Sequence, residues 1–411
     1  MSRSLIMIVG LSLAVSVFIC GCSSDGGGGS DPGPDLEISV ELDLNQMDLE
    51  VSNSQELTAT VKDAVNNDLT WYVNDIENGS NILGTITQNS PVTYTAPDYV
   101  PLVDEVVIKA VSVEDTTKYD SCRVNITFET LFVDPVNGND DSGNGCVNRP
   151  FKTLNHASFE ADSGMTIVAL PGVYSAATGE YFPVQPRAVD VTIEGTDWEQ
   201  CIIRGHDLPG GYHMIVNLMR DRAVFRKFTL EQGPGEPVCA VALKMEAVDV
   251  RIDSIRAFER ARYAVCRAEH ATRPIIENCL FVVDEGELDN RGINLFPNSS
   301  GGILRNCTIT GFATGLTVTD TSDLLVEGCT IEGNGIGVEL YAEGSPGSLN
   351  PDFGGGLRGS AGGNVFRDNV DCGLWFDLPH DIYGKYNTWG NSPPIAGVDY
   401  CERGDGDLIY E

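Results

Sequence analysis

A short motif that recurs through the C-terminal two thirds of the chain is the feature that most constrains the fold. Its third residue is always apolar, and successive copies begin between 22 and 35 residues apart. A repeat of this length is typical of stacked architectures, in which each copy belongs to one turn of a coil. Eight copies align: Cys201-Ile-Ile203, Phe228-Thr-Leu230, Ile255-Arg-Ala257, Cys279-Leu-Phe281, Cys307-Thr-Ile309, Cys329-Thr-Ile331, Asn364-Val-Phe366 and Asn387-Thr-Trp389.

The shortness of these segments predicts a coil of parallel strands, because the L-x-x-L-x-L framework of leucine-rich repeats is absent. Equivalent residues then stack into columns about 4.8 Å apart. The first motif position becomes an interior column, in which Cys279, Cys307 and Cys329 occupy successive rungs and Asn364 and Asn387 form an asparagine ladder. A thiolate metal site is the alternative for the cysteines, but such sites favour C-x-x-C pairs, which the chain lacks.

A second column supports the alignment. We expect the residue three places before each motif to face the interior as well: Trp198, Phe225, Ile252, Ile276, Leu304, Val326, Ala361 and Gly384. The long interval between the sixth and seventh copies is assigned to an inserted loop, Ala342 to Gly363, which is rich in glycine, serine and proline. Insertions in solenoids often frame the binding face.

The N-terminal residues predict export. Residues 1–21 join one arginine to an apolar run, which has the form of a secretory signal and is too short to span a bilayer. The segment ending at Cys22 resembles a bacterial lipobox, and the resemblance implies that Cys22 is acylated. A plain signal peptide with incidental cysteines is the alternative. Residues 22–36 predict a flexible linker, so a lipid would anchor the protein in a bacterial cell envelope, at the outer membrane or cell surface.

Short alternating strands separated by turn residues indicate a β-sandwich over residues 37–129. Several segments resemble bacterial immunoglobulin-like domains: Leu69-Thr-Trp71, Gly84-Thr-Ile86, Tyr94-Thr-Ala-Pro97 and Ile108-Lys-Ala-Val-Ser112. The resemblance implies a spacer or adhesive module with Trp71 in its core. Cys122 is the one cysteine of this segment, so the sandwich holds no internal disulfide.

The start of the coil resembles the entry segment of pectate-lyase-like right-handed β-helix proteins. The resemblance rests on Phe132-Val-Asp-Pro-Val-Asn-Gly138, Arg149-Pro-Phe-Lys-Thr-Leu154 and Ile167-Val-Ala-Leu-Pro-Gly-Val-Tyr174, and Tyr386-Asn-Thr-Trp-Gly-Asn-Ser-Pro-Pro394 resembles their exit. It implies an all-β protein with a right-handed parallel β-helix over residues 130–411. Because a solenoid must cover its open end, residues 151–160 are expected to form a capping helix. Activity does not transfer with the fold.

The net charge of the chain limits the classes of partner that it can bind. The chain carries 60 acidic and 26 basic residues, a net charge of -34, which would repel nucleic acid. Between Arg220 and Arg273 the balance inverts, with 11 basic and 8 acidic residues. The resemblance implies polysaccharide lyases, which use Arg or Lys to take a proton and to stabilise an enolate-like intermediate. Candidate ligand-binding residues for an acidic polysaccharide are Arg256, Arg260, Arg262 and Arg267.

A ladder of opposite charges is the alternative to such a groove. The residues two places before the first six motifs are Glu199, Arg226, Asp253, Glu277, Arg305 and Glu327. Opposite charges on neighbouring rungs stabilise one another by about 0.2–1 kcal/mol. The ladder accounts for Arg226 and Arg305 without a ligand, but not for Arg256, Arg260 or Arg262.

Two further sites are predicted. An acidic turn offers oxygen ligands to calcium, or is only an exposed turn, since the D-x-[DN]-x-[DN]-G pattern is absent; its residues are Asp284, Glu285, Glu287 and Asp289. Cys239 and Cys266 are 27 residues apart, which predicts adjacent rungs and a disulfide in an oxidising compartment. The histidines are scattered, and G-x-S-x-G, H-E-x-x-H and phosphate-loop motifs are absent, so no catalytic residue is assigned.

Two functions fit these observations. The first is a lipid-anchored monomer whose coil binds a polysaccharide or cell-surface glycan, or serves as an adhesive rod. The second is a carbohydrate-active enzyme, a lyase or hydrolase acting on acidic polysaccharide. The resemblance implies carboxylate pairs on neighbouring strands for hydrolases, and the outward middle motif position carries none, which favours binding: Ile202, Thr229, Arg256, Leu280, Thr308, Thr330, Val365 and Thr388.

Overall fold

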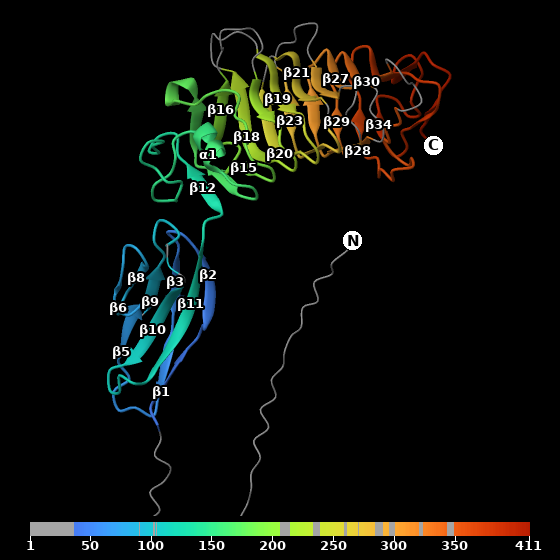
Figure 1. Ribbon diagram of the computed structural model, residues 1–411. Coiled ribbons are helices and arrows are strands. Elements are labelled where there is room, and N and C mark those ends of the chain that lie inside the picture. Colours follow the sequence, from blue (N-terminus) through green and yellow to red (C-terminus); the bar gives the residue numbers. More distant parts are fainter. Residues whose placement is uncertain are drawn as a thin grey trace, which may run out of the picture.

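The computed structural model describes two β domains joined end to end (Figure 1). It covers residues 37–89, 91–101, 103, 105–205, 214–232, 239–258, 261–269, 271–283, 291–295, 301–319, 324–342 and 349–411. The side chains of residues 232, 239–242, 258, 261–263 and 341 lie outside this description, as do the predicted signal peptide, Cys22 and the linker. In the part of the chain so described, no helix is both long and apolar enough to cross a bilayer.

The first domain is a sandwich. One sheet has the strand order β2-β11-β10-β5-β6, another β3-β9-β8-β7, and β1 pairs with β4. Its strands are β1 (Ser39–Leu42), β2 (Gln46–Glu50), β3 (Ser54–Leu57), β4 (Ala59–Lys62), β5 (Leu69–Val73), β6 (Ile76–Glu77), β7 (Gly79–Ser80), β8 (Gly84–Ile86), β9 (Val92–Thr95), β10 (Val106–Ser112) and β11 (Tyr119–Thr127). Trp71 and Cys122 lie in its core, as predicted. The predicted sandwich is confirmed, and its immunoglobulin-like character stays a prediction.

The second domain is a coil whose strands pair in parallel from one turn to the next. A 15-stranded sheet runs along it. Its strands are β12 (Thr130–Val133), β13 (Thr166–Ala169), β14 (Gly172–Ser175), β15 (Thr192–Gly195), β16 (Cys201–Gly205), β18 (Val224–Gln232), β20 (Arg251–Phe258), β22 (Ile275–Glu277), β23 (Leu280–Val282), β25 (Ile303–Arg305), β26 (Thr308–Thr310), β28 (Leu325–Glu327), β29 (Thr330–Ile331), β31 (Val365–Phe366) and β34 (Thr388–Trp389).

An 8-stranded parallel sheet forms another side of the coil. It contains β17 (Met214–Leu218), β19 (Cys239–Met245), β21 (Ala261–Ala268), β24 (Arg291–Leu295), β27 (Thr314–Thr319), β30 (Ile336–Tyr341), β32 (Cys372–Asp377) and β35 (Tyr400–Glu402). A small pair, β33 (Ile382–Tyr383) and β36 (Leu408–Ile409), lies at the last turns. The apolar side chains between the sheets form one continuous core.

The register confirms the predicted motif alignment at every step. The middle motif residues pair in order from Ile202 through Thr229, Arg256, Leu280, Thr308, Thr330 and Val365 to Thr388. On either side of this outward column, the first and third motif residues therefore face the interior, because successive side chains of a strand point to opposite faces. Seven of the eight residues in the first column are buried, and Asn387 is half-buried.

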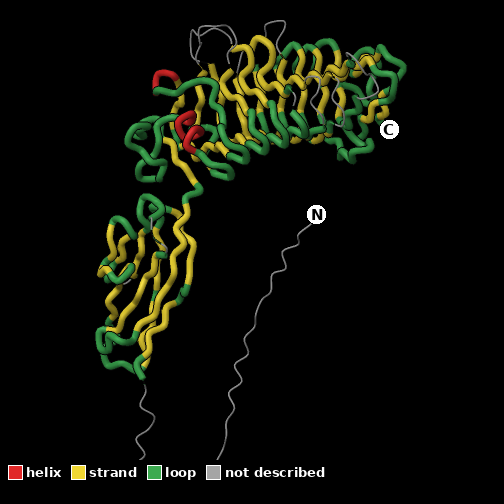
Figure 2. Tube along the Cα trace, in the orientation of Figure 1, coloured by secondary structure: helices red, strands yellow, loops and turns green. Residues whose placement is uncertain are grey.

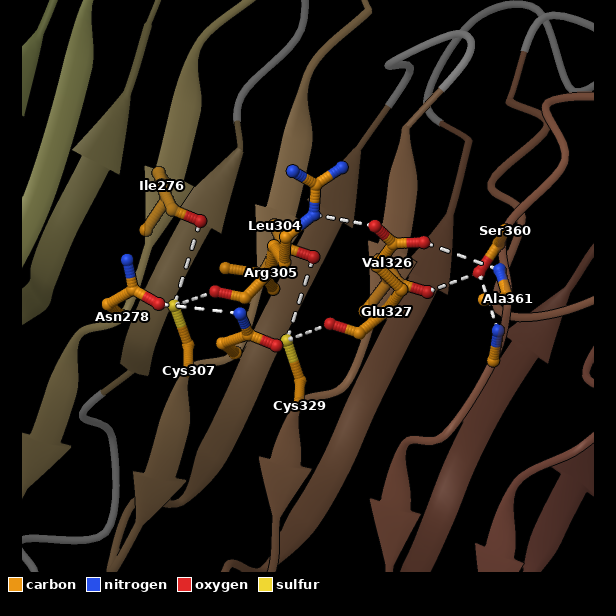
Figure 3. Close-up of polar contacts among 12 residues, drawn as sticks. Ile276, Asn278, Leu304, Arg305, Cys307, Val326, Glu327, Cys329, Ser360 and Ala361 are labelled. Atoms are coloured by element: carbon orange, nitrogen blue, oxygen red, sulfur yellow. Dashed lines mark hydrogen bonds and ion pairs between the residues drawn. The ribbon is translucent and has the colours of Figure 1, made fainter.

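The cysteine rungs are a packing feature of this column. Figure 3 shows Cys307 and Cys329 side by side on neighbouring turns. The Cys307 thiol donates to the carbonyls of Ile276 at 3.6 Å and Arg305 at 3.2 Å. Cys329 repeats this arrangement one turn further on. Burial raises the pKa of both thiols well above the usual value, so they stay neutral.

The second interior column differs from its prediction at the first rung. Ile193 pairs with Phe225 and occupies the position expected for Trp198. The difference arises because residues 196–200 form a bend and turn between β15 and β16. Trp198 is half-buried in this turn and does not reach the core.

The same column differs again at the seventh rung. Asp352 bridges Leu325 and Tyr383 on the two neighbouring turns. Phe353, the next residue, therefore fills the interior position, and the expected Ala361 is exposed. The predicted insertion thus includes coil residues, and the loop that follows them spans residues 354–363.

The turn before the motif has a left-handed residue on most rungs. Asn278, Asn306 and Gly328 have φ of 55°, 52° and 64°, and Tyr386 has φ of 62°. Asn and Gly tolerate this conformation, whereas it costs other L-residues roughly 1–2 kcal/mol. Tyr386 therefore occupies a strained backbone position with its side chain 73% exposed.

Replacing Tyr386 by glycine is expected to stabilise the coil. The relief of left-handed strain exceeds the extra entropy of glycine in the unfolded chain, so we expect a gain of about 0.5–1 kcal/mol. Urea unfolding followed by circular dichroism measures it. Tyr386→Ala is the control, because alanine removes the same ring but keeps the strain. Equal stability of the two variants would contradict the explanation.

A short helix covers the first turn of the coil. The predicted helix is confirmed as α1 (Leu154–Glu160), and Figure 2 shows helical segments near the β12 end of the coil. Thr153 caps it by accepting from His156 N at 3.2 Å. The Glu180 carboxylate accepts from the backbone N of Leu154 at 2.7 Å, of Asn155 at 3.1 Å and of Tyr181 at 3.2 Å. A 3-10 turn, η1 (Ala176–Thr178), precedes this glutamate.

This buried glutamate predicts a pH dependence. Burial raises the pKa of Glu180 from 4.5 to about 7, against the opposing effect of its backbone donors. The native carboxyl thus binds its proton more tightly than the unfolded one, so its contribution is complete below pH 4.5 and is lost as the pH rises through about 7. Relative to Glu180→Gln, the wild type should lose on the order of 3 kcal/mol across this window. Parallel unfolding curves of wild type and variant at all pH values would contradict this.

The loop that opens the coil docks on the sandwich. Asn144 Nδ2 and the Cys146 thiol both donate to the Asp98 carbonyl at 2.9 Å. Asn148 Nδ2 and Ser52 Oγ each donate to the Asp98 carboxylate, also at 2.9 Å. Cys146 is buried within the core cluster of the sandwich. The two domains therefore share packing at their junction.

Candidate functional site

Two of the four predicted arginines, Arg256 and Arg267, lie on different sheets. Arg256 lies on β20 of the 15-stranded sheet, 3.7 Å from a carboxylate oxygen of Glu199 and with its guanidinium carbon 5.2 Å from the Trp198 ring centroid. Arg267 lies on β21 of the 8-stranded sheet, 3.2 Å from a carboxylate oxygen of Glu269. Each of these two arginines therefore lies beside its own carboxylate.

The other predicted ligands fall outside the described residues. Arg260 is among them, and of Arg262 only the backbone is described. The predicted calcium turn also lies there: Asp284, Glu285, Glu287 and Asp289. Within the described ranges, no group of three His, Cys, Asp or Glu side chains is placed to hold a metal ion.

The predicted disulfide between Cys239 and Cys266 is wrong. Cys239 pairs with Ala261, and Cys266 pairs with Leu243, four residues further along the strand. At about 3.3 Å per residue this separation exceeds the 7 Å between Cα atoms that a disulfide can bridge. Cys266 is a buried free thiol whose pKa burial raises to about 12. The prediction assumed 27 residues between paired positions, but paired residues of β19 and β21 are only 22 or 23 residues apart.

The charge ladder on the 15-stranded sheet is confirmed with one change. Glu194, rather than Glu199, lies beside Arg226, at 2.5 Å. Arg305 contacts Glu327 at 2.5 Å in the same way (Figure 3). These partly exposed pairs account for the arginines of this column as structural ion pairs, each worth about 1 kcal/mol or less.

A polar column runs along the outer face of the 8-stranded sheet. Its members point away from the core because the residues on either side of each one, along most of the strands, face inward. The strand register places them on successive rungs: Asn217, Lys244, Arg267, Asn294, Thr317, Glu339, Trp375 and Cys401. Most of the rungs from Asn217 to Thr317 are buried, whereas Glu339 and Trp375 are half-buried.

A cavity of about 300 Å³ opens at the half-buried end of this column. Its lining combines one aromatic ring, two carboxylates and one guanidinium: Arg291, Glu339, Ala342, Trp375 and Asp377. Glu339 on β30 stands opposite Trp375 on β32, and Asp377 follows two residues later. Strand spacing and rise place the Cα atoms of Glu339 and Asp377 about 8 Å apart.

Hydrogen bonds and a ring contact order this cavity. Arg291 Nε donates to Thr317 Oγ1 at 3.1 Å, and that hydroxyl donates to the Glu339 carboxylate at 3.5 Å. The guanidinium carbon of Arg403 lies 5.7 Å from the Trp375 ring centroid, which holds the indole by a cation–π contact. The aromatic and the charged walls are thus fixed from opposite sides.

Glycines of the 8-stranded sheet lie two residues before several of these positions. A Cβ on Gly315 would lie 2.7 Å from the Gly337 carbonyl oxygen and 2.9 Å from a methyl of Ile331. Only glycine at position 315 therefore permits the close approach of β27 and β30. Thr317 and Glu339 follow two residues later on these strands and point outward into the column.

The cavity suits a ligand with both polar and apolar faces. The indole offers an apolar surface, the carboxylates accept hydrogen bonds from hydroxyl groups, and the guanidinium donates to ligand oxygens. Two carboxylates on neighbouring strands also provide the groups that general acid–base chemistry requires.

Sequence reasoning missed this cavity because it examined the outward position of the wrong sheet. The motif belongs to the 15-stranded sheet, and its outward middle position carries no carboxylates. The available signal was the similar pattern of Ile336-Gly-Val-Glu339 and Cys372-Gly-Leu-Trp375, which places Glu339 beside Trp375 when Ile336 is paired with Cys372.

Two family descriptions match the second domain. Residues 256–377 match "Right handed beta helix region", and residues 136–201 match a family described as of unknown function, DUF1565. The first match agrees with the stacked parallel sheets and with the register of the motif columns. This domain is a right-handed parallel β-helix. The predicted fold is confirmed, and the second match covers much of the predicted entry segment of the β-helix.

Solved structures with a similar fold are remote in sequence. The Dettilon tailspike protein (gp208) is 10% identical with a TM-score of 0.40, covering 64% of this chain and 55% of its own. A GH136 lacto-N-biosidase from Eubacterium ramulus is 10% identical with a TM-score of 0.36, covering 69% and 67%. A rhamnogalacturonan lyase is 15% identical with a TM-score of 0.25, covering 68% and 62%. The chain thus spans about half the length of the tailspike protein. No curated protein matches.

Proposed function

We propose that the protein binds a glycan through the cavity on the 8-stranded sheet of its β-helix. The observation that carries the proposal is a lining that combines the indole of Trp375 with the carboxylates of Glu339 and Asp377 and the guanidinium of Arg291. A saccharide ring has an apolar face of C–H groups and a rim of hydroxyls. The indole packs against the first, and the charged groups bind the second.

The charge of the protein supports selection by local contacts rather than by long-range attraction. With a net charge of -34, the chain repels polyanions at a distance. The cavity pairs its two carboxylates with Arg291 and with Arg403 behind the ring. This near balance suits a neutral or weakly charged saccharide.

Replacing Trp375 by alanine tests the proposal. A glycan array identifies a binding saccharide, and calorimetry then measures its dissociation constant. Loss of a central aromatic contact typically costs about 2 kcal/mol or more, so we expect the affinity to fall at least about 30-fold. Tyr119→Ala, which removes an exposed ring from the sandwich, should leave the affinity unchanged. Unaltered affinity of the Trp375→Ala variant would refute the assignment.

A carbohydrate-active enzyme is the second candidate, and Glu339 and Asp377 on neighbouring strands favour it. Glycosidases add water across a glycosidic bond with one carboxyl group as acid and a second as base or nucleophile. Reducing ends released from an array-identified glycan report hydrolysis, and ultraviolet absorbance reports unsaturated uronate from a lyase. Glu339→Gln and Asp377→Asn should each slow hydrolysis at least about 100-fold while binding persists. Stable glycan during prolonged incubation excludes the enzyme.

We also propose that the protein is a monomer held in a bacterial cell envelope by a lipid on Cys22. Support comes from the lipobox-like segment and the glycine-rich linker that follows. Metabolic labelling with an alkyne fatty acid should tag the wild type but not Cys22→Ser, and the variant should leave the membrane fraction. Labelling of the variant would contradict the anchor.

A further inference from the structure

A second cavity lies at the capped end of the β-helix, away from the 8-stranded-sheet cavity. Its volume is about 510 Å³, within the range of sites that bind small ligands. One wall comes from α1 and the other from residues 181–187. The residues that carry the argument below are His156, Phe159, Tyr181, Gln185 and Arg187.

Two exposed aromatic rings flank this cavity. The side chains of Phe159 and Tyr181 are 71% and 75% exposed. Among the described side chains, every other phenylalanine is buried or half-buried, so Phe159 stands apart. Large apolar surfaces left exposed and gathered at one concave site mark a binding surface.

The wall that carries Tyr181 is fixed before any ligand arrives. Asn155 Nδ2 donates to the carbonyls of Tyr181 and, at 3.1 Å, of Pro183. The buried Glu180 carboxylate ties the same segment to the start of α1. A preformed cavity loses little conformational entropy on binding.

The lining of the cavity carries one guanidinium, that of Arg187, and one carboxylate, that of Asp140. Arg187 is exposed, and among the described residues no carboxylate lies within ion-pair distance of its guanidinium. Arg220 lies next to it, since its Nε donates to the Arg187 carbonyl at 2.8 Å. Asp140, the carboxylate on the lining, already accepts from Lys152 N at 2.7 Å and from Thr153 Oγ1 at 2.8 Å.

We propose that this cavity binds a carboxylated sugar residue. The rings of Phe159 and Tyr181 pack against the apolar face of the sugar, and the Arg187 guanidinium pairs with its carboxylate in the bidentate geometry that guanidinium favours. Gln185 and His156 bond its hydroxyls. The proposal does not depend on the Trp375 cavity, which is lined by other residues and suits a ligand of different charge.

Calorimetry with glucuronate and N-acetylneuraminate, with neutral glucose for comparison, tests this site on the full chain. We expect both acids to bind at least 10-fold more tightly than glucose. Arg187→Gln should abolish that preference, and Tyr181→Ala should weaken both acids at least 10-fold. Arg123→Gln, which removes an exposed arginine from the sandwich, is the matched control. Trp375→Ala should leave this binding intact, which separates the site from the proposed glycan cavity.

Several results would overturn the proposal. Equal affinity for acids and glucose, or no measurable binding of either acid, excludes a carboxylated sugar. Unchanged binding in both Arg187→Gln and Tyr181→Ala excludes this location. Sedimentation that shows a dimer dispersed by Phe159→Ala would assign the exposed rings to a second copy of the chain instead. Because the side chains of Phe159, Tyr181 and Arg187 are exposed, melting curves of their variants should match the wild type.

Discussion

Replacing Asn364 by leucine is expected to lower the free energy of unfolding of the β-helix by about 3–5 kcal/mol. The Asn364 side chain is fully buried and makes four hydrogen bonds. Its Oδ1 accepts from Cys329 N at 2.9 Å, and its Nδ2 donates to the carbonyls of Val326 at 3.1 Å and Phe353 at 2.9 Å and to Asn387 Oδ1 at 3.0 Å. Leucine has a similar volume but leaves the Cys329 N–H without its acceptor and takes one donor from each of the three oxygens.

Urea unfolding of the full chain measures this loss, with the β-helix transition followed separately from that of the sandwich. Val365→Thr is the control, since it changes the next residue on the outward face and should cost less than about 0.5 kcal/mol. A loss below 1 kcal/mol for Asn364→Leu would show that the ladder contributes little. Asn364→Asp should also destabilise, because it buries a charge and removes two donors.

Replacing Asp352 by alanine is expected to cost a similar amount. Asp352 is 3% exposed, and its carboxylate accepts from four backbone N–H groups of the loop that follows. The donors are Gly354 at 2.9 Å, Gly356 at 3.0 Å, Arg358 at 3.0 Å and Ser360 at 3.2 Å. Alanine leaves these donors without an acceptor, so we expect a loss of about 3–5 kcal/mol, much of it through disorder of the loop.

Replacing Asp352 by asparagine tests the role of the second carboxylate oxygen. An amide keeps one acceptor oxygen, so Asp352→Asn should fall between wild type and Asp352→Ala. Amide hydrogen exchange of Gly354 and Gly356 should accelerate in the same order. Asp405→Asn, which alters an exposed carboxylate of the same domain, should change neither readout. Unchanged exchange rates in Asp352→Ala would contradict the proposed role of the carboxylate.

The repeated motif was sufficient to predict the register of the longer sheet. A residue that faces the interior must be apolar on every turn or must hydrogen-bond with its neighbours along the coil. The column from Cys201 to Asn387 is therefore visible in the sequence. Counting residues back from the motif gave the wrong interior residue where a turn changed length. The bend around Trp198 and the residues after Phe353 shift the second column without leaving a periodic signal.

The candidate site was not predictable in the same way. Arg291, Glu339 and Asp377 lie on three strands of the 8-stranded sheet, and they meet only after the turns between the sheets are placed. Those turns vary in length, so no fixed spacing links the three residues. Arg256 and Arg267 show that closeness in sequence is not sufficient either. They lie on consecutive strands of the chain, β20 and β21, but these strands belong to different sheets.

The docking of Cys146 and its neighbours on Asp98 has a mechanical consequence. A pull on a ligand held by the β-helix reaches the sandwich through this packed seam, because the seam joins the two cores by buried contacts and hydrogen bonds. In the proposed lipid-anchored protein, the predicted linker would be the flexible point, and the length of the sandwich would set how far from the membrane the β-helix reaches.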